Sequence, residues 1–149
     1  MEIIIGSDHG GYGLKEKLKK YLSSKGISSE DVGAFNRDSC DYPDLAAKLS
    51  RKVLEKKQLG IIICGTGLGV CMASNKFMGI RAALCYDKYT AKMAREHNDA
   101  NVLCLGGRTI DFGKAKQIAD TFLNTETSTE ERHKRRVEKI SEIEKNNFK

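Results

Sequence analysis

The sequence has little of several features that mark other classes of protein. It contains no tryptophan, one proline and three histidines in 149 residues. No apolar run approaches the roughly 18 residues that a membrane-spanning helix requires. The first residues, M-E-I-I-I-G-S-D, lack the basic start and the long apolar core of a secretory signal. We therefore expect a single cytoplasmic domain over residues 1–149 that does not bind a membrane.

Paired cysteines are also missing. The chain has five cysteines, but no two of them form a C-x-x-C pair and no histidine stands at zinc-finger spacing. A disulfide framework and a structural metal site are therefore not expected. The neighbours of Cys71, Cys85 and Cys104 are mostly apolar, which favours a role for these cysteines as small buried side chains.

Charge, in contrast, is plentiful and biased towards the positive sign, with a formal net charge of +6. Lysines flank an apolar stripe over residues 14–25, which is typical of a solvated helix face. The sequence has no RNA-binding motif and no interleaving of aromatic and basic residues, so a nucleic-acid partner is not expected. The positive charge favours the approach of anionic small molecules.

Apolar runs and helical periodicities alternate along the chain. We predict strands at 3–5, 27–33, 59–64, 80–86 and 101–105. We predict helices at 14–25, from Pro43 onwards, at 67–76, from an N-cap at Asp87 to about His97, and at 111–124. Five strands separated by helices indicate a parallel sheet that is covered by helices on both faces.

The residues with chemical potential follow these strands. Asp8 and His9 follow the first strand, Cys64 to Gly69 follow the third, and Gly106 to Arg108 follow the fifth. In a parallel sheet ligands bind at the carboxyl ends of the strands, where the strand order reverses. The sequence therefore predicts a site at this edge.

The loop after the third strand, I-I-I-C-G-T-G-L-G (61–69), resembles a nucleotide-binding loop without matching one. Counted from Gly65, the third glycine of a dinucleotide fingerprint is replaced by Val70, and no G-K-[ST] follows for a phosphate-binding P-loop. Asp87, twenty residues after Gly67, imitates the acid that grips a ribose, so a nucleotide- or sugar-phosphate-binding protein without catalysis remains an alternative.

The remaining interpretation of the loop is a nest of backbone N–H groups that stabilises an anion or an oxyanion. Cys64 lies at its mouth, where a helix N-terminus favours the thiolate, and Thr66 supplies a hydroxyl nearby. A histidine acid or base opposite such a thiolate is chemically reasonable.

The C-terminal segment is different in character. The capping-box pattern S-T-E-E (128–131) predicts the start of a helix over about 128–146, whose narrow apolar stripe is expected to pack on a neighbouring subunit. Pairing of Glu130 with Lys134, and of Glu131 with Arg135, leaves Arg132 and Arg136 unpaired one turn apart. Two such guanidinium groups suit a phosphate, although a solvated basic face is the alternative.

Seven motifs in order extend over nearly the whole chain: G-S-D-H-G-G, D-Y-P-D, I-C-G-T-G-L-G, N-K-x-x-G-I-R-A, R-E-H-N-D-A-N-V-L, G-G-R and R-H-x-x-R-V-x-K-I. This set resembles the type B ribose-5-phosphate isomerases, in the wider family of allose- and galactose-6-phosphate isomerases. The resemblance implies a Rossmann-like three-layer α/β/α fold with a five-stranded parallel sheet and an extra C-terminal helix. It also implies a homodimer, or a dimer of dimers, in which both subunits furnish each site.

The resemblance further implies an aldose–ketose isomerase of the pentose phosphate pathway that interconverts ribose 5-phosphate and ribulose 5-phosphate without cofactor or metal. Cys64 would be the base, Thr66 and the backbone of the glycine loop would hold the oxyanion, and His97 would open the sugar ring. The expected substrate-binding residues are Asp8, His9, Gly65, Gly67, Leu68, Gly69, Asn98, Arg108, Arg132 and Arg136.

A subgroup of the family has a glutamate base immediately after the last loop glycine. Val70 occupies that position here, which indicates the cysteine-using subgroup. Allose 6-phosphate and galactose 6-phosphate remain alternative substrates, because a sequence gives no distance between the base and the phosphate anchor.

Overall fold

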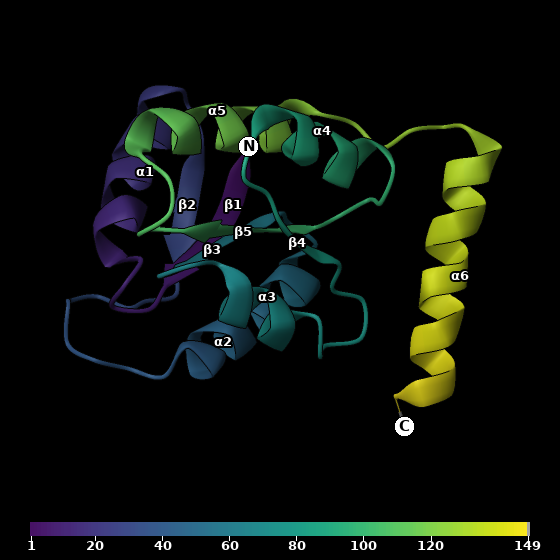
Figure 1. The fold of residues 1–149 in the computed structure, drawn as a ribbon, viewed down its shortest axis with the longest axis horizontal. Helices are drawn as coiled ribbons and strands as arrows, with labels where there is room; N and C mark the ends of the chain where they lie inside the picture. The colour runs from purple at the N-terminus through teal and green to yellow at the C-terminus, as the bar shows by residue number, and fades with distance from the viewer. Residues whose placement is uncertain (149) are drawn as a thin grey trace.

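The computed structural model describes residues 1–148, which form a sheet between two layers of helices, with a further helix at one side (Figure 1). The strands are β1 (Glu2–Ser7), β2 (Ser28–Asp31), β3 (Gly60–Cys64), β4 (Ala82–Leu84) and β5 (Val102–Gly106). The helices are α1 (Tyr12–Ser24), α2 (Tyr42–Lys56), α3 (Leu68–Ser74), α4 (Lys88–Glu96), α5 (Phe112–Asn124) and α6 (Glu131–Asn147).

All strand pairs are parallel, and the strand order is β2-β1-β3-β5-β4. Helices α1, α4 and α5 cover one face of the sheet, and α2 and α3 cover the other (Figure 1). The predicted three-layer α/β/α architecture is therefore confirmed. The chain leaves β1 towards β2 on one side and returns to β3 on the other. The reversal places a crevice between the carboxyl ends of β1 and β3, where ligands of such sheets bind.

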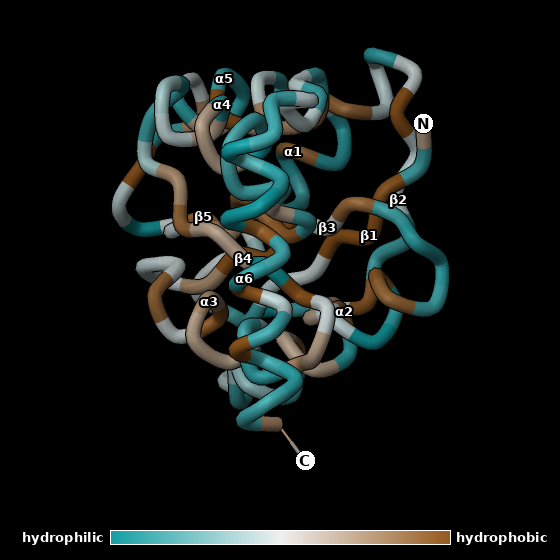
Figure 2. Tube along the Cα trace, turned by 90° about the vertical axis from the view of Figure 1, so that its right-hand side faces the viewer, coloured by the Kyte–Doolittle hydropathy of each residue, from teal (hydrophilic) through white to brown (hydrophobic). Residues whose placement is uncertain are grey.

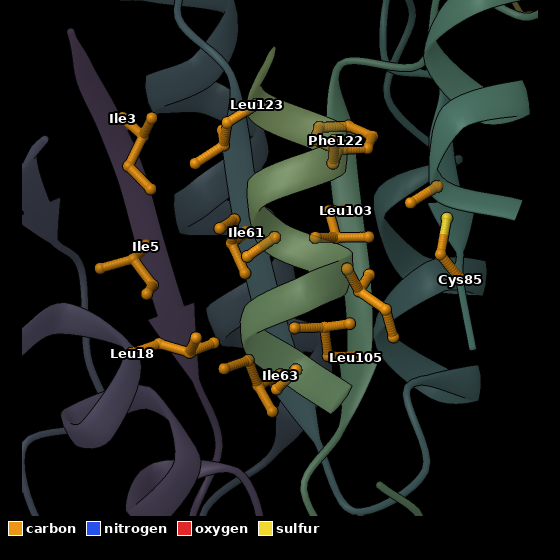
Figure 3. Close-up of a cluster of buried hydrophobic side chains, with 14 of the residues drawn as sticks. Ile3, Ile5, Leu18, Ile61, Ile63, Cys85, Leu103, Leu105, Phe122 and Leu123 are labelled. Atoms are coloured by element: carbon orange, nitrogen blue, oxygen red, sulfur yellow. The ribbon is translucent and has the colours of Figure 1, made fainter. Parts of the chain in front are cut away.

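The core lies on both faces of the sheet, and strand alternation decides which side chain meets which helices. Figure 3 shows Ile61 and Ile63 of β3 on the α1/α5 face, in one cluster with Phe122 and Leu123 of α5. Ile62 and Cys64 point the opposite way and pack with the residues of α2. The period of two therefore fixes Cys64 on the α2/α3 face, at the last position of β3.

Two predicted strands are shorter than expected. The strand predicted at 27–33 is limited to β2, and the strand predicted at 80–86 is limited to β4. At the open edge of β4 the side chain of Asn75 replaces a neighbouring strand. Its Oδ1 accepts from the Ala82 N–H at 2.8 Å, and its Nδ2 donates to the Ala82 carbonyl at 3.0 Å. A side chain can satisfy one residue in this way but cannot continue a ladder.

The predicted N-cap of α4 is confirmed. Asp87 accepts from the backbone N–H of Thr90 at 2.7 Å, and the Thr90 hydroxyl completes a capping box. The same hydroxyl donates to the Asp87 carboxylate at 2.7 Å. Because Asp87 is engaged in capping, it does not support the ribose-gripping role of a nucleotide-binding protein.

Helix α6 begins later than predicted, and the expected capping box is absent. The Ser128 hydroxyl accepts from the Glu130 N–H at 3.1 Å, so it closes a turn before the helix instead of capping it. Glu130 is the N-cap, without a side-chain capping bond. Figures 1 and 2 show α6 standing beside the edge of the sheet near β4. His133 is its only buried residue among those described, and Ile140 and Ile143 are 45% and 63% exposed.

Within residues 1–148, no helix has the combination of length and apolar character that crossing a membrane requires. The cytoplasmic location expected from the sequence stays a prediction.

Candidate active site

The Cys64 thiol is held at the junction of β3 and the glycine loop. Its side chain is buried, with 5% of the residue exposed, and its sulfur accepts the backbone N–H of Gly67 at 3.1 Å. Gly67 has φ of 81°, in the left-handed region that favours glycine, which lets the loop turn this N–H back towards the sulfur. The thiol therefore has a fixed position at the start of α3.

The amides of the glycine loop are partly occupied by the protein itself. Gly67 donates to Cys64, and the Leu68 N–H donates to the Thr66 hydroxyl at 3.2 Å. An incoming oxyanion must therefore displace these acceptors or use the flanking amides. The structure shows a loop before a helix, as expected, but the sulfur and the hydroxyl already use two of the amide donors of the predicted nest.

Asp8 and His9 lie across the crevice from this loop. The Asp8 N–H donates to the Ile63 carbonyl at 3.1 Å, which ties the end of β1 to β3. The Asp8 carboxylate is buried and its Oδ1 accepts from Gly11 at 3.1 Å. A Cβ added to Gly11 would lie 2.4 Å from the Ile63 carbonyl oxygen, so only glycine permits this approach.

Arg108 joins the same edge from the loop after β5. Its N–H donates to the Gly65 carbonyl at 2.9 Å, and the Gly107 N–H donates to the Cys64 carbonyl at 2.8 Å. The Arg108 guanidinium packs against two glycines. A Cβ added to Gly65 would lie 3.0 Å from Arg108 Nη1, and a Cβ added to Gly10 would lie 3.4 Å from Arg108 Cζ. The loops after β1, β3 and β5 thus converge, as predicted, and bring Asp8, Cys64 and Arg108 together.

The other predicted site residues form a second cluster. His97 is the C-cap of α4, and its ring stacks on that of His133 with centroids 4.0 Å apart and an angle of 11° between the planes. The side chain of His97 is 37% exposed, whereas His133 is buried. The sequence singled out His97 but not its partner, because no spacing rule links a residue of α4 to one of α6.

Arg132 and Arg136 are also on α6, but the predicted pattern of ion pairs is wrong. Arg132 Nε pairs with Glu130 at 2.9 Å, and no pair of Glu130 with Lys134 or Glu131 with Arg135 exists among residues 1–148. The late start of the helix leaves Glu130 at the N-cap, outside the helical spacing that would set it beside Lys134. Both members of the Arg132 pair are exposed, and such pairs contribute about 0–1 kcal/mol. Breaking this pair would therefore cost Arg132 little.

Within one chain, the cluster of Asp8, Cys64 and Arg108 lies at the carboxyl ends of the strands, and the second cluster lies at their amino ends. Cys64 and Gly106 are the last residues of their strands, whereas His97 and Asn98 come before β5. The amino ends of β5 and β3 lie side by side, because the Gly60 N–H donates to the Asn101 carbonyl. Five residues of a parallel strand rise about 16 Å. The chain therefore does not bring Cys64 and His97 into one site by itself.

A groove of about 420 Å³ separates α6 from the sheet edge beside the second cluster. Apolar side chains supply most of its surface, and Asn98 is part of its wall. At one end the groove is closed by the bond from Gly79 N to the Glu144 carboxylate, at 3.0 Å. Its apolar lining includes Ile80, Ala82, Ala100, Ile140, Ile143 and Phe148.

Sequence reasoning gave no site role to Tyr42, although it lies in the D-Y-P-D motif. A Cβ added to Gly69 would lie 2.4 Å from Cε1 of Tyr42, so the ring rests directly on the start of α3. Tyr42 is 41% exposed, beside the last glycine of the glycine loop. The signal for it in the sequence was an aromatic residue inside a motif, because ligand pockets are lined largely by apolar and aromatic side chains.

The other cysteines differ in environment. Cys85 and Cys104 are buried as predicted, and burial raises the pKa of Cys85 to about 12 and that of Cys104 above its ordinary value. Cys71 is half-buried on α3, and a hydrogen bond with Cys104 lowers its pKa to about 7, against the effect of burial. Its sulfur donates to the Ala82 carbonyl at 3.5 Å, towards β4. Within residues 1–148 no three His, Cys, Asp or Glu side chains gather as metal ligands do.

The docking of α6 should depend on pH through His133. Burial, then the neighbouring His97 and Arg132, lower the pKa of His133 below its usual 6.5, while Glu130 opposes them. The folded state therefore favours neutral His133, so stability is full above pH 6.5 and falls as the pH drops below it. We expect faster amide hydrogen exchange in α6 at pH 5.5 than at pH 7.5, after correction for intrinsic rates. A His133→Phe variant, which keeps an aromatic ring, should lose much of this difference, and an unchanged difference would contradict the assignment.

Several known proteins are similar to this chain over most of its length. The family model described as Ribose/Galactose Isomerase matches residues 3–140. Ribose-5-phosphate isomerase B of Escherichia coli is 40% identical, with 96% of each chain covered. A ribose-5-phosphate isomerase B structure from Clostridium thermocellum is 48% identical with a TM-score of 0.94, covering 98% of this chain and 99% of that one.

A further structure, that of ribose-5-phosphate isomerase B from Mycoplasma genitalium with bound ribulose 5-phosphate, is 42% identical with a TM-score of 0.91. It covers 98% of this chain and 97% of its own. These similarities extend over nearly the whole chain. The chain therefore belongs to the ribose/galactose isomerase family.

Proposed function

We propose that the protein interconverts D-ribose 5-phosphate and D-ribulose 5-phosphate, a reaction of the pentose phosphate pathway. The observation that carries the proposal is the buried Cys64 thiol, held by the glycine loop at the carboxyl end of β3, where the loops that carry Asp8 and Arg108 also meet. The relatives named above, one of them with bound ribulose 5-phosphate, support the choice of substrate.

The chemistry requires a base, an acceptor for negative charge and an anchor. As a thiolate, Cys64 removes the C2 proton of the open-chain aldose and returns it to C1. The electron pair left at C2 forms the enediolate, whose oxygen charge is held by the loop amides and by the Thr66 hydroxyl. The hydroxyl proton of O2 moves to O1, so atoms and charge balance. Burial of the sulfur keeps water from the intermediate.

The second cluster supplies the remaining functions. His97 is proposed to open the furanose ring, and Asn98 to bind the sugar. Arg108, from the first cluster, and Arg132 and Arg136 hold the phosphate. The two clusters lie at opposite ends of the strands in one chain, so the complete site needs a second copy of the chain. The α4 and α6 residues of that copy would meet the carboxyl ends of the strands that carry Cys64 in the first. The exposed apolar stripe of α6 supports this arrangement. The working unit is then a homodimer or a dimer of dimers with shared sites.

Arg132→Ala should raise KM for ribose 5-phosphate about tenfold with a smaller change in kcat. Phosphate binding is shared by the ground and transition states, so its loss weakens both equally. Steady-state kinetics provide the test, with Arg135→Ala on the same helix as the control for a general change of charge. An unchanged KM for Arg132→Ala would remove the residue from the phosphate anchor.

The choice of sugar is tested by comparing kcat/KM for ribose 5-phosphate, allose 6-phosphate and galactose 6-phosphate. We expect the five-carbon substrate to exceed both hexose phosphates by at least about tenfold, because an extra carbon alters the distance between the anion anchor and the base. A higher kcat/KM for either hexose phosphate would replace the proposed substrate within the same reaction type.

A further inference from the structure

The segment between β2 and α2 reaches the active-site edge, and the mechanism above gives it no role. Its start is fastened by Lys15, a fully buried side chain whose Nζ donates to the Ala34 carbonyl and pairs with Asp31 at 2.8 Å. Its far end is fastened by Cys40, whose backbone N–H donates to Nδ1 of His9 at 3.2 Å. The segment is therefore held at both ends, and one of its anchors is a residue of the crevice.

The Cys40 contact fixes the proton of His9. A backbone N–H can only donate, so Nδ1 must accept, and the neutral imidazole then carries its proton on Nε2. The Cys40 sulfur lies 3.9 Å from the same Nδ1, and its weak S–H donor acts in the same direction. Among residues 1–148, both hydrogen-bond contacts of the His9 ring are made by Nδ1, and Nε2 makes none.

We propose that Cys40 is a positioning residue whose backbone N–H presents His9 to the sugar as an Nε2–H hydrogen-bond donor. His9 is then not a proton acceptor in the isomerisation, which leaves that task to Cys64. The identity of the ligand rests on the proposed function, but the tautomer of His9 does not.

The neighbouring Asp8 gives this donor a matching acceptor. Asp8 uses Oδ1 for the Gly11 N–H at 3.1 Å, and its other oxygen is left for an external donor. A hydroxyl group both donates and accepts. An acceptor from Asp8 beside a donor from His9 therefore suits a sugar hydroxyl, and a carbonyl or ether oxygen could use only the donor.

The tautomer is measured directly by nitrogen-15 NMR of the full-length protein with labelled histidine, at a pH where His9 is neutral. His9→Gln serves to assign its signals. We expect a proton on Nε2 and an unprotonated Nδ1. A proton on Nδ1 would overturn the proposal. This readout needs no substrate, so its failure is separate from any failure of the proposed isomerase activity.

Two substitutions of His9 separate the donor from the anchor. In His9→Asn the side-chain oxygen can still accept from Cys40, but no donor reaches the position of Nε2. In His9→Gln the amide N–H reaches that position. We expect kcat/KM for His9→Asn to be at least about tenfold below that for His9→Gln, since the loss of one hydrogen bond costs about that factor. Equal values in the two folded variants would overturn the proposal.

Two substitutions of Cys40 separate the backbone N–H from the thiol. Cys40→Ala keeps the N–H, so the Nε2–H tautomer should persist. Cys40→Pro removes the N–H, and Nδ1–H should then become populated in the NMR spectrum. Loss of the Nε2–H tautomer in Cys40→Ala would transfer the role to the sulfur and overturn the assignment to the backbone. The wild-type spectrum decides the question if Cys40→Pro does not fold.

Discussion

Replacing Cys64 by serine should lower kcat for ribose 5-phosphate by about 10³-fold, the usual contribution of a positioned base. A serine hydroxyl is not ionised near neutral pH, so it cannot take a proton from carbon, although it can accept the Gly67 N–H as the sulfur does at 3.1 Å. Serine is therefore expected to preserve the loop and remove the chemistry. Steady-state turnover, together with circular dichroism and thermal unfolding, separates these effects.

Cys71→Ala is the matched control. Cys71 is half-buried and has a pKa of about 7, yet it points towards β4 and not into the crevice. We expect Cys71→Ala to keep kcat within about twofold of the wild-type value, in line with a substitution outside the reacting centre. Near-normal turnover in a folded Cys64→Ser variant would remove Cys64 as the base. A large loss in Cys71→Ala alone would assign the reactive thiol to α3.

Mixing two inactive variants should restore activity if the site is shared between subunits. Cys64→Ser inactivates the part of the site at the end of β3, and His97→Asn inactivates the part of the site at the end of α4. After joint unfolding and refolding, about half of the dimers contain one chain of each kind, and one of their two sites is intact, which gives about a quarter of wild-type turnover. Titration of one variant into the other should give a maximum near equal amounts.

The control for this experiment pairs two substitutions from the same edge. Cys64→Ser mixed with Arg108→Ala should gain nothing, because Arg108 lies over Gly65 beside Cys64 and both belong to one chain's half of the site. Restoration in this control, or none in the first mixture despite exchange of subunits shown by mass spectrometry, would contradict the division of the site between the two edges.

Much of the fold follows from local patterns that need no tertiary information. The runs I-I-I and V-L-C-L predict buried strands because both faces of a parallel sheet are covered. The N-cap at Asp87 was predicted for a similar reason, since its bond to Thr90 joins residues three apart. Predictions went wrong where a competing side chain intervened, at Asn75 beside β4 and at Ser128 before α6.

The sequence by itself determined that a thiol ends a buried strand and that a glycine loop follows it. A thiol at the end of an apolar strand, followed by alternating glycines, can be recognised from spacing, because strand alternation and loop geometry are local. The sequence alone could not determine that His97 stacks on His133 or that the Cys40 backbone hydrogen-bonds to His9. It also could not determine that His97 and Cys64 lie at opposite ends of the strands. Only the tertiary structure decided these points, because they depend on which distant segments the packing of helices on the sheet brings side by side.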